Sequence, residues 1–245
     1  MMDISDPIVI FLIAVIFLLG GIIKGVIGMG LPVFTVALGT LFMPVTEVFG
    51  LSIIPILVTN FWQVRHGKGA TEVFKRFWPM IIMMLIGLVV GSELISVLDG
   101  DTLLTIIGVV IVVTSIMGLA NPHAHISKRA EFPVSLVAGF SSGVSGGLST
   151  IWGPPISMFL MMTDLKKEDY ICATGVIWVL AAVPLSVLFY LNGIIHSGNY
   201  LYSMALCVPS MIGIGIGQHI RSRFSQDTFR KILLIILLVI GFNLI

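Results

Sequence analysis

The chain has 245 residues, of which 57% are hydrophobic and only 10% are charged. Soluble domains carry about 25% charged residues, so this composition excludes a water-soluble fold and indicates a surface that faces lipid. The net charge of +1 excludes a polybasic nucleic-acid-binding face, and the two cysteines, Cys172 and Cys207, lie in apolar stretches that suggest no disulfide, metal site or cofactor.

Apolar runs separated by charge clusters and by glycine or proline predict an all-α polytopic membrane protein with about ten segments. In chain order we expect these segments at 7–23, 29–43, 48–62, 77–98, 102–120, 132–149, 154–163, 170–192, 199–219 and 229–245. We expect the first segment to be a retained span, because no Lys or Arg precedes it and no signal-peptide cleavage motif follows it.

Positive charges mark one side of this arrangement. All but one of the 13 Lys and Arg residues fall in or beside alternate connections, and the intervening connections contain none. Cytoplasmic loops retain Lys and Arg, so ten crossings place both termini outside the cytoplasm. The remaining cation, Lys24, lies within the first glycine-rich segment.

The chain divides into two halves of five segments, 1–120 and 132–245, joined by a basic linker at 121–131. An odd number of segments in each half predicts inverted repeats. Two glycine patterns support the division, because Gly21-Gly25-Gly28 recurs as Gly139-Gly143-Gly146, and Gly87-Gly91 before Asp101-Thr102 recurs as Gly213-Gly217 before Asp227-Thr228. The second offset is larger, which implies extra residues in the second half, part of them at 149–152.

Two interpretations of these glycines remain open. Small residues recur wherever membrane helices pack closely, which needs no repeat at all. Inverted repeats, in contrast, are typical of secondary transporters, in which one half moves against the other around a site near the middle of the membrane.

Each half is expected to open with a broken or re-entrant segment. Gly28 and Gly30 precede Pro32, and a second glycine-rich run precedes Pro154 and Pro155. Glycine disfavours a helix and proline removes an amide donor, so both runs predict interruptions, which are tolerated in a membrane only inside the protein or beside a wet cavity. Helices that restart at proline direct free N–H groups toward the break, which favours an anion.

The side chains near the breaks suit the same ligand. Hydroxyls of the second break can donate to an oxyanion, and Lys24 supplies a positive charge. We therefore expect substrate contacts from Lys24, Gly25, Gly28, Gly30, Asn60, Ser142, Ser145, Gly146, Ser149 and Thr150. Alternatives stay open: Lys24 can extend to the inner interface or pair with a carboxylate, Asn60 can join two helices, and a serine can bond a carbonyl one turn back.

Together these features resemble the TauE/SafE sulfite exporter family, also called toluene sulfonate uptake permeases (TSUP). The matching stretches are the Gly25–Pro32 run, Thr59-Asn60 leading to Arg65-His66-Gly67, and Gly87-Gly91 before Asp101, with their second-half counterparts. The resemblance implies a transporter rather than an enzyme, which exports sulfite, thiosulfate or an organosulfonate across the bacterial inner membrane. A proton or sodium as coupling ion and a homodimer within the lipid are compatible with it.

Two rival functions use the same residues. An anion channel would share the polar pathway but would not concentrate its solute. A rhomboid-like intramembrane serine protease is suggested by Gly143-Val144-Ser145-Gly146, although Ser145 would need a base within hydrogen-bond reach.

Overall fold

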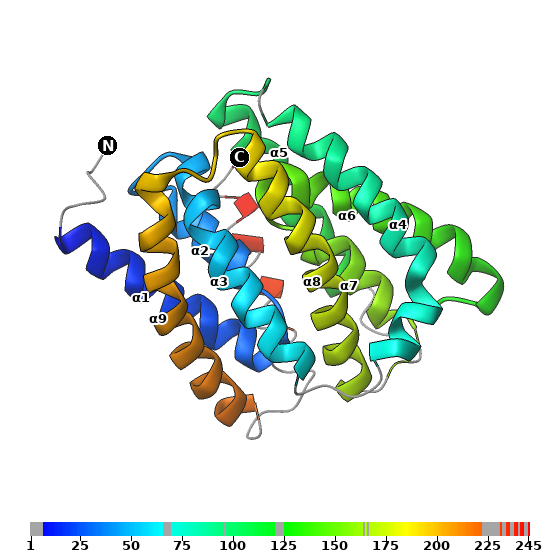
Figure 1. The fold of residues 1–245 in the computed structure, drawn as a ribbon. Coiled ribbons are helices and arrows are strands. Elements are labelled where there is room, and N and C mark those ends of the chain that lie inside the picture. The colour runs from blue at the N-terminus through cyan, green and yellow to red at the C-terminus, as the bar shows by residue number, and fades with distance from the viewer. Residues whose placement is uncertain are drawn as a thin grey trace.

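The computed structural model describes most of the chain as helix. It describes residues 7–65, 70–95, 97–120, 125–163, 165, 167–221, 231, 234–235, 238–239, 241–242 and 245. Within these ranges the structure contains nine continuous helices, further helical residues between 231 and 242, and no strand (Figure 1). The helices are α1 (Pro7–Ile27), α2 (Leu31–Gly39), α3 (Val45–Arg65), α4 (Ala70–Leu94), α5 (Gly100–Ala120), α6 (Lys128–Ser149), α7 (Gly153–Met161), α8 (Lys167–Leu191) and α9 (Ser197–Arg221).

Nine of the predicted segments coincide with these helices. The predicted segment at 229–245 lies largely outside the described residues, and its described residues up to position 242 are helical. The main difference is at charged helix ends, because α4 begins at Ala70 and α6 at Lys128, earlier than apolar character alone predicts. Near these helix starts, Arg76 in the second turn of α4 forms an ion pair with Glu131 in the first turn of α6, at 2.8 Å.

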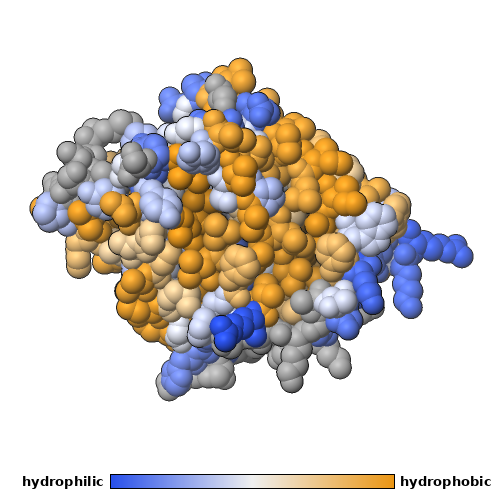
Figure 2. All heavy atoms as spheres, in the orientation of Figure 1, coloured by the Kyte–Doolittle hydropathy of each residue, from blue (hydrophilic) through white to orange (hydrophobic). Residues whose placement is uncertain are grey.

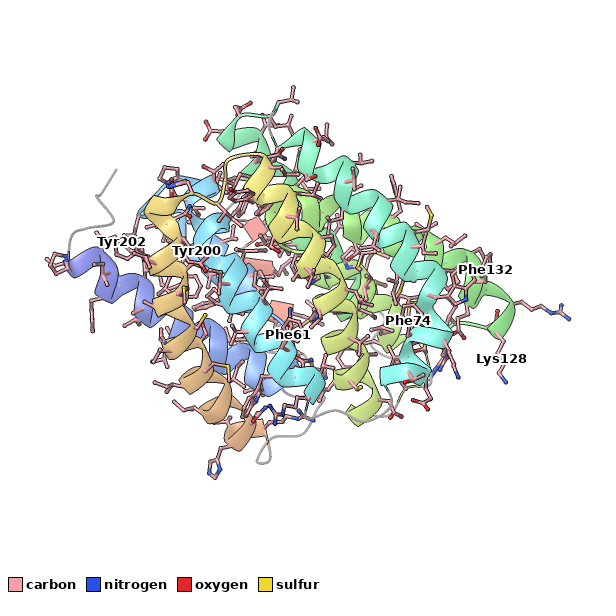
Figure 3. The ribbon with its side chains drawn as sticks, viewed as in Figure 1. Phe61, Phe74, Lys128, Phe132, Tyr200 and Tyr202 are labelled. Atoms are coloured by element: carbon pink, nitrogen blue, oxygen red, sulfur yellow. The ribbon has the colours of Figure 1, made fainter. Side chains whose placement is uncertain are left out.

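Six of the described helices, α1, α3, α4, α5, α8 and α9, are long and apolar enough to cross a membrane. Figure 2 shows a broad hydrophobic face with hydrophilic side chains at its upper and lower edges. Half-exposed aromatic side chains, including Phe61, Phe74, Phe132 and Tyr200, add to this surface (Figure 3). The protein is therefore a multi-pass membrane protein, as its composition predicts.

Both predicted interruptions are present. Between α1 and α2 the chain turns at Gly28 and Gly30, whose φ angles of 83° and 105° lie in the left-handed region that favours glycine. Between α6 and α7 the turn falls at Thr150, with a φ of 63°. The helices that follow, α2 and α7, have only nine residues each and carry proline in the first turn. Each half therefore begins with a long helix, a turn and a short helix.

The repeated glycines form two close helix interfaces. α1 packs along α9, and α4 packs along α6 (Figure 1). A Cβ atom on Gly21 or Gly25 would overlap the backbone of α9, and one on Gly213 or Gly217 would overlap that of α1. Backbones that approach this closely need small residues at the contact.

The second interface, between α4 and α6, has the same kind of glycine contact. A Cβ atom on Gly87 or Gly91 of α4 would overlap the backbone of α6, and one on Gly139 or Gly143 would overlap that of α4. Each interface thus joins the first helix of one half to the fourth helix of the other. The glycine patterns serve helix packing, and both packing contacts cross between the halves.

Alanine substitutions at two glycines of α9, Gly217 and Gly215, test the contact between α1 and α9. A Cβ atom on Gly217 would overlap the Ile22 carbonyl oxygen, whereas one on Gly215 would have no neighbour within 4 Å. Gly217→Ala should lower the free energy of unfolding by about 1–3 kcal/mol, because the helices must separate. Gly215→Ala should be neutral or slightly stabilising. Thermal unfolding in detergent measures both, and equal melting temperatures for the two variants would contradict the interface.

Candidate functional site

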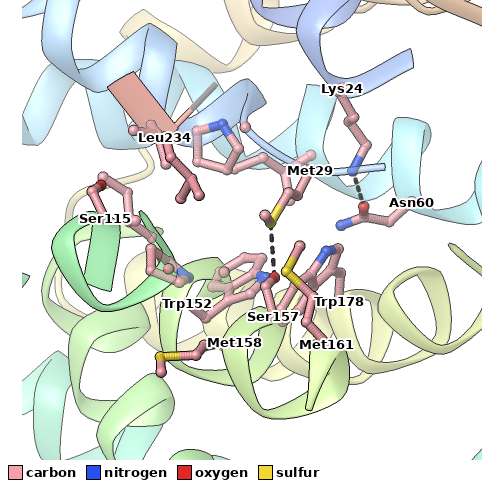
Figure 4. Close-up of a pocket in the computed structure, with 18 residues that line it drawn as sticks. Lys24, Met29, Asn60, Ser115, Trp152, Ser157, Met158, Met161, Trp178 and Leu234 are labelled. Atoms are coloured by element: carbon pink, nitrogen blue, oxygen red, sulfur yellow. Dashed lines mark hydrogen bonds between the residues drawn. The ribbon is translucent and has the colours of Figure 1, made fainter. Parts of the chain in front are cut away.

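A cavity of about 60 Å³ lies between the two breaks (Figure 4). Met29 and Gly30 line it from the first break, and Ile151 and Trp152 line it from the second. One water molecule occupies about 10–15 Å³ on the same measure, so the cavity has room for several waters or one small solute. The two interruptions therefore face each other across a single space.

The short helices both begin at this cavity. Gly30, Pro32 and Val33 line it at the N-terminus of α2, and Gly153 and Pro154 line it at the N-terminus of α7. The first N–H groups of a helix have no partner within the helix and carry a partial positive charge. Two helix ends of the same sign therefore meet at one cavity, which favours a negatively charged solute.

Lys24 is the only cationic side chain among the described residues that line the cavity. It is 4% exposed, and its Nζ donates a hydrogen bond to Oδ1 of Asn60, which is 1% exposed (Figure 4). No carboxylate in the described part of the chain forms an ion pair with it. A buried ammonium group is costly without a negative partner, so this arrangement is suited to an anionic ligand.

Lys24 also borders a second, smaller pocket of about 20 Å³. Gly25 and Gly28 line this pocket together with Gln63 and Arg221. Gln63 joins α3 to α8, because its Nε2 donates to the carbonyl oxygen of Ile171 at 2.8 Å and to Oγ1 of Thr174 at 2.9 Å. The side chain of Lys24 is therefore shared by two adjacent spaces.

Three predicted substrate-binding serines instead bond the backbone of the second break. Ser142 donates to the carbonyl oxygen of Trp152, and Ser145 donates to that of Ile151 at 2.6 Å. Ser149 donates to the carbonyl oxygen of Ser145 at 2.6 Å and accepts a hydrogen bond from the Ile151 N–H at 3.2 Å. Ser145 and Ser149 thus bond the C=O and N–H of Ile151 in the turn itself, Ser149 also bonds a carbonyl one turn back, and none of the three serines lines the cavity.

Gly146 and Thr150 also shape the second break without lining the cavity. Gly146 lies against Trp152, where an added Cβ atom would come within 2.8 Å of the tryptophan Cβ. Thr150 occupies the left-handed turn, and its buried Oγ1 has no hydrogen-bond partner among the described residues. Of the ten predicted contacts, Lys24, Gly30 and Asn60 line the larger cavity.

The structure adds lining residues that sequence reasoning did not select. Ser157 lies in the first turns of α7 and donates to Sδ of Met29 at 2.8 Å, across the gap between the breaks. Trp152 and Trp178 line one wall, with their ring centroids 6.2 Å apart. Ser115 of α5 lines the cavity too. Ser157 follows Pro154 closely enough for helix geometry to have indicated it, whereas no sequence pattern marks Ser115.

Ser145 is not arranged as a catalytic nucleophile in this geometry. Its hydroxyl donates to a backbone carbonyl rather than to a histidine, and a nucleophilic serine needs an adjacent base. The Gly-x-Ser-Gly pattern is used for packing, because Gly143 contacts α4 and Gly146 contacts Trp152. The described arrangement therefore gives the protease alternative no support.

Comparison with known proteins identifies one family. The model of the family described as sulfite exporter TauE/SafE matches residues 12–244, which is nearly the whole chain. No curated protein and no solved structure matches the chain.

Ser145→Ala tests the role of the hydroxyls at the second break. The substitution leaves the Ile151 carbonyl without this donor, so it should lower the free energy of unfolding by about 1–3 kcal/mol. Ser141→Ala is the matched control, because Ser141 is exposed and its hydroxyl donates to the Val137 carbonyl within α6. Thermal unfolding of both variants measures the difference, and an unchanged melting temperature for Ser145→Ala would show that the bond does not stabilise the break.

Proposed function

The chain belongs to the sulfite exporter TauE/SafE family, and from this premise we propose that it is a secondary transporter which exports a small sulfur-containing anion across the bacterial inner membrane. The observation that carries the proposal is the buried pair of Lys24 and Asn60 at the cavity between the two breaks. A sulfur oxyanion supplies the negative charge that this pair lacks within the described residues.

The anionic group is placed at Lys24. There the ammonium group offers charge-assisted hydrogen bonds, and the amide nitrogen of Asn60 offers neutral ones. The N-termini of α2 and α7 contribute partial positive charge from two sides. The hydroxyl of Ser157 can exchange its bond to Met29, a weak acceptor, for a stronger one to a sulfonate oxygen.

The rest of the cavity favours an organosulfonate over bare sulfite. Trp152, Trp178, Met158 and Met161 provide an apolar lining beyond the Lys24 end. Contact between this apolar lining and the hydrocarbon part of a ligand is favourable, because both surfaces leave water. Bare sulfite has no hydrocarbon part to make that contact. A short organic chain attached to a sulfonate group matches both parts of the cavity.

We place the two halves as inverted repeats, 1–120 and 132–245, joined through 121–131. The order of a long helix, a break, a nine-residue helix and two long helices is the same in α1–α4 and α6–α9, which supports this placement. The helix contacts support it as well, because α1 packs against α9 and α6 packs against α4, so the first helix of each half contacts the fourth helix of the other. With Lys- and Arg-rich connections inside, both termini lie in the periplasm.

Alternating access then follows from movement of the α1–α9 pair against the α4–α6 pair, because close glycine contacts hold each pair together. The two breaks lie one in each half, so relative movement opens the cavity to one side of the membrane or the other. Lys24 borders both the cavity and the smaller pocket, so its ammonium group can follow the anion between them. Met29, an unbranched and flexible side chain, can move aside as the anion passes.

Counterflow in proteoliposomes tests the proposed carrier against a channel. Vesicles loaded with unlabelled 2-hydroxyethanesulfonate should take up labelled 2-hydroxyethanesulfonate transiently above its equilibrium level, because a carrier exchanges one anion for another. Initial rates should saturate with concentration. Flux without counterflow and without saturation would identify a channel, and no flux of any sulfur oxyanion would reject the proposed substrate class.

Lys24→Gln and Asn60→Asp test the binding pair. Loss of a charged hydrogen bond should weaken sulfonate binding by about tenfold to a hundredfold in Lys24→Gln. Asn60→Asp should have at least as large an effect, because the new carboxylate pairs with Lys24 and repels the anion. Calorimetric titration of the purified protein measures both dissociation constants.

Lys128→Gln is the charge-matched control for this experiment. Lys128 is exposed at the beginning of α6 and projects away from the helix bundle (Figure 3). Its removal should leave the dissociation constant unchanged. Equal affinities for Lys24→Gln and Lys128→Gln would show that Lys24 does not bind the anion.

A further inference from the structure

Ser115 is a buried hydroxyl without a partner among the described residues. It lies on α5 and is 1% exposed, and its Oγ has no hydrogen-bond partner there. It lines the cavity, and Figure 4 shows it on the side opposite Lys24 and Asn60. The two ends of the cavity therefore both carry polar side chains, and Met29 lies between them.

Several other buried serines on long helices donate their hydroxyl hydrogen to a carbonyl oxygen of the same helix. Ser52 donates to the Val48 carbonyl at 2.7 Å, and Ser92 donates to the Val89 carbonyl at 2.9 Å, each within its own helix. Ser115 makes no such bond in the described structure. A buried hydroxyl without a partner is costly, so a cavity-lining hydroxyl of this kind marks a place where a ligand provides the partner.

The surroundings of Ser115 restrict the chemistry of that partner. The neighbouring lining residues Gly118 and Leu234 carry no charge, and the sole charged residue among the described lining is Lys24 at the other end. A second ionised group beside Ser115 would be buried without a counter-charge, which costs far more than one hydrogen bond returns. A neutral hydroxyl or carbonyl group meets the requirement without that cost.

We propose that Ser115 is a specificity residue that hydrogen-bonds a neutral hydroxyl or carbonyl group at the far end of an organosulfonate whose sulfonate group lies at Lys24. This inference rests on the proposed function, because it assumes a sulfonate at the Lys24 end. It adds that the substrate has two polar ends of different charge, joined by a short apolar chain against the tryptophan and methionine side chains of the cavity.

Two ligands of equal length separate the contribution of Ser115 from that of Lys24. 2-Hydroxyethanesulfonate ends in a hydroxyl group, and 1-propanesulfonate ends in a methyl group at the same place. Calorimetric titration of the purified full-length protein should give about tenfold tighter binding of the hydroxylated ligand, since a site that hydrogen-bonds a ligand hydroxyl rejects its apolar analogue. Sulfoacetate, which ends in a carboxylate, should bind more weakly than 2-hydroxyethanesulfonate.

Ser115→Ala should abolish this preference, chiefly by weakening the binding of 2-hydroxyethanesulfonate. Ser115→Cys, which keeps the shape of the side chain with a slightly larger atom but is a weak donor, should do the same and covers the case in which the alanine variant folds poorly. Ser92→Ala is the matched control, because it removes a buried serine hydroxyl away from the cavity and should retain the preference.

Two results would overturn the inference while leaving the proposed function intact. One is equal affinity of the wild-type protein for 2-hydroxyethanesulfonate and 1-propanesulfonate. The other is an unchanged preference in Ser115→Ala and Ser115→Cys. Binding of neither sulfonate to the wild-type protein would reject the proposed function and this inference together.

Discussion

Backbone N–H and C=O groups inside a membrane must find partners within the protein, and the two interrupted helices are where this chain meets that requirement. At the first interruption, glycines adopt positive φ angles that let the backbone reverse direction. At the second, the hydroxyls of Ser142 and Ser145 donate hydrogen bonds to the carbonyl oxygens of Trp152 and Ile151. Once these groups are satisfied, the short helices α2 and α7 can begin at a common cavity. The position of the site is thus a consequence of how the breaks are stabilised.

The glycine interfaces place those breaks relative to each other. Both long helices that lead into a break, α1 and α6, pack closely against the fourth helix of the opposite half. Each of the two helix pairs, α1 with α9 and α4 with α6, therefore joins one helix from each half and can move as one unit. Movement between two such units would change the cavity from both sides at once, while the helix contacts within each unit are kept. Lys24 lies close to one of these contacts, because it precedes Gly25 of the α1–α9 interface.

Much of this arrangement was predictable because it depends on residue type and order. Glycine before proline predicted both breaks, and Lys24 stood out because every other cation followed the charge pattern of the loops. The direction of the serine hydroxyls was not predictable, because it depends on where the carbonyls of Ile151 and Trp152 lie after folding. The glycine patterns marked α1 and α6 as corresponding helices, but they did not indicate that α1 packs against α9 and α6 against α4, since helix pairing is decided by the whole bundle. Ser115 has no sequence signal, because its burial and the lack of a hydrogen-bond partner among the described residues are properties of the folded protein.

The most direct test of the central claim is to locate the bound anion. A structure of the protein with 2-bromoethanesulfonate would place the bromine by its anomalous scattering and the sulfonate by its density. If the anion binds at Lys24, the sulfonate lies within hydrogen-bond distance of Lys24 Nζ. The bromine then points toward Ser115, in the cavity between the breaks at 28–30 and 150–152. A bound sulfonate elsewhere in the protein, with the Lys24–Asn60 hydrogen bond unchanged and the cavity empty of it, would contradict the proposed site.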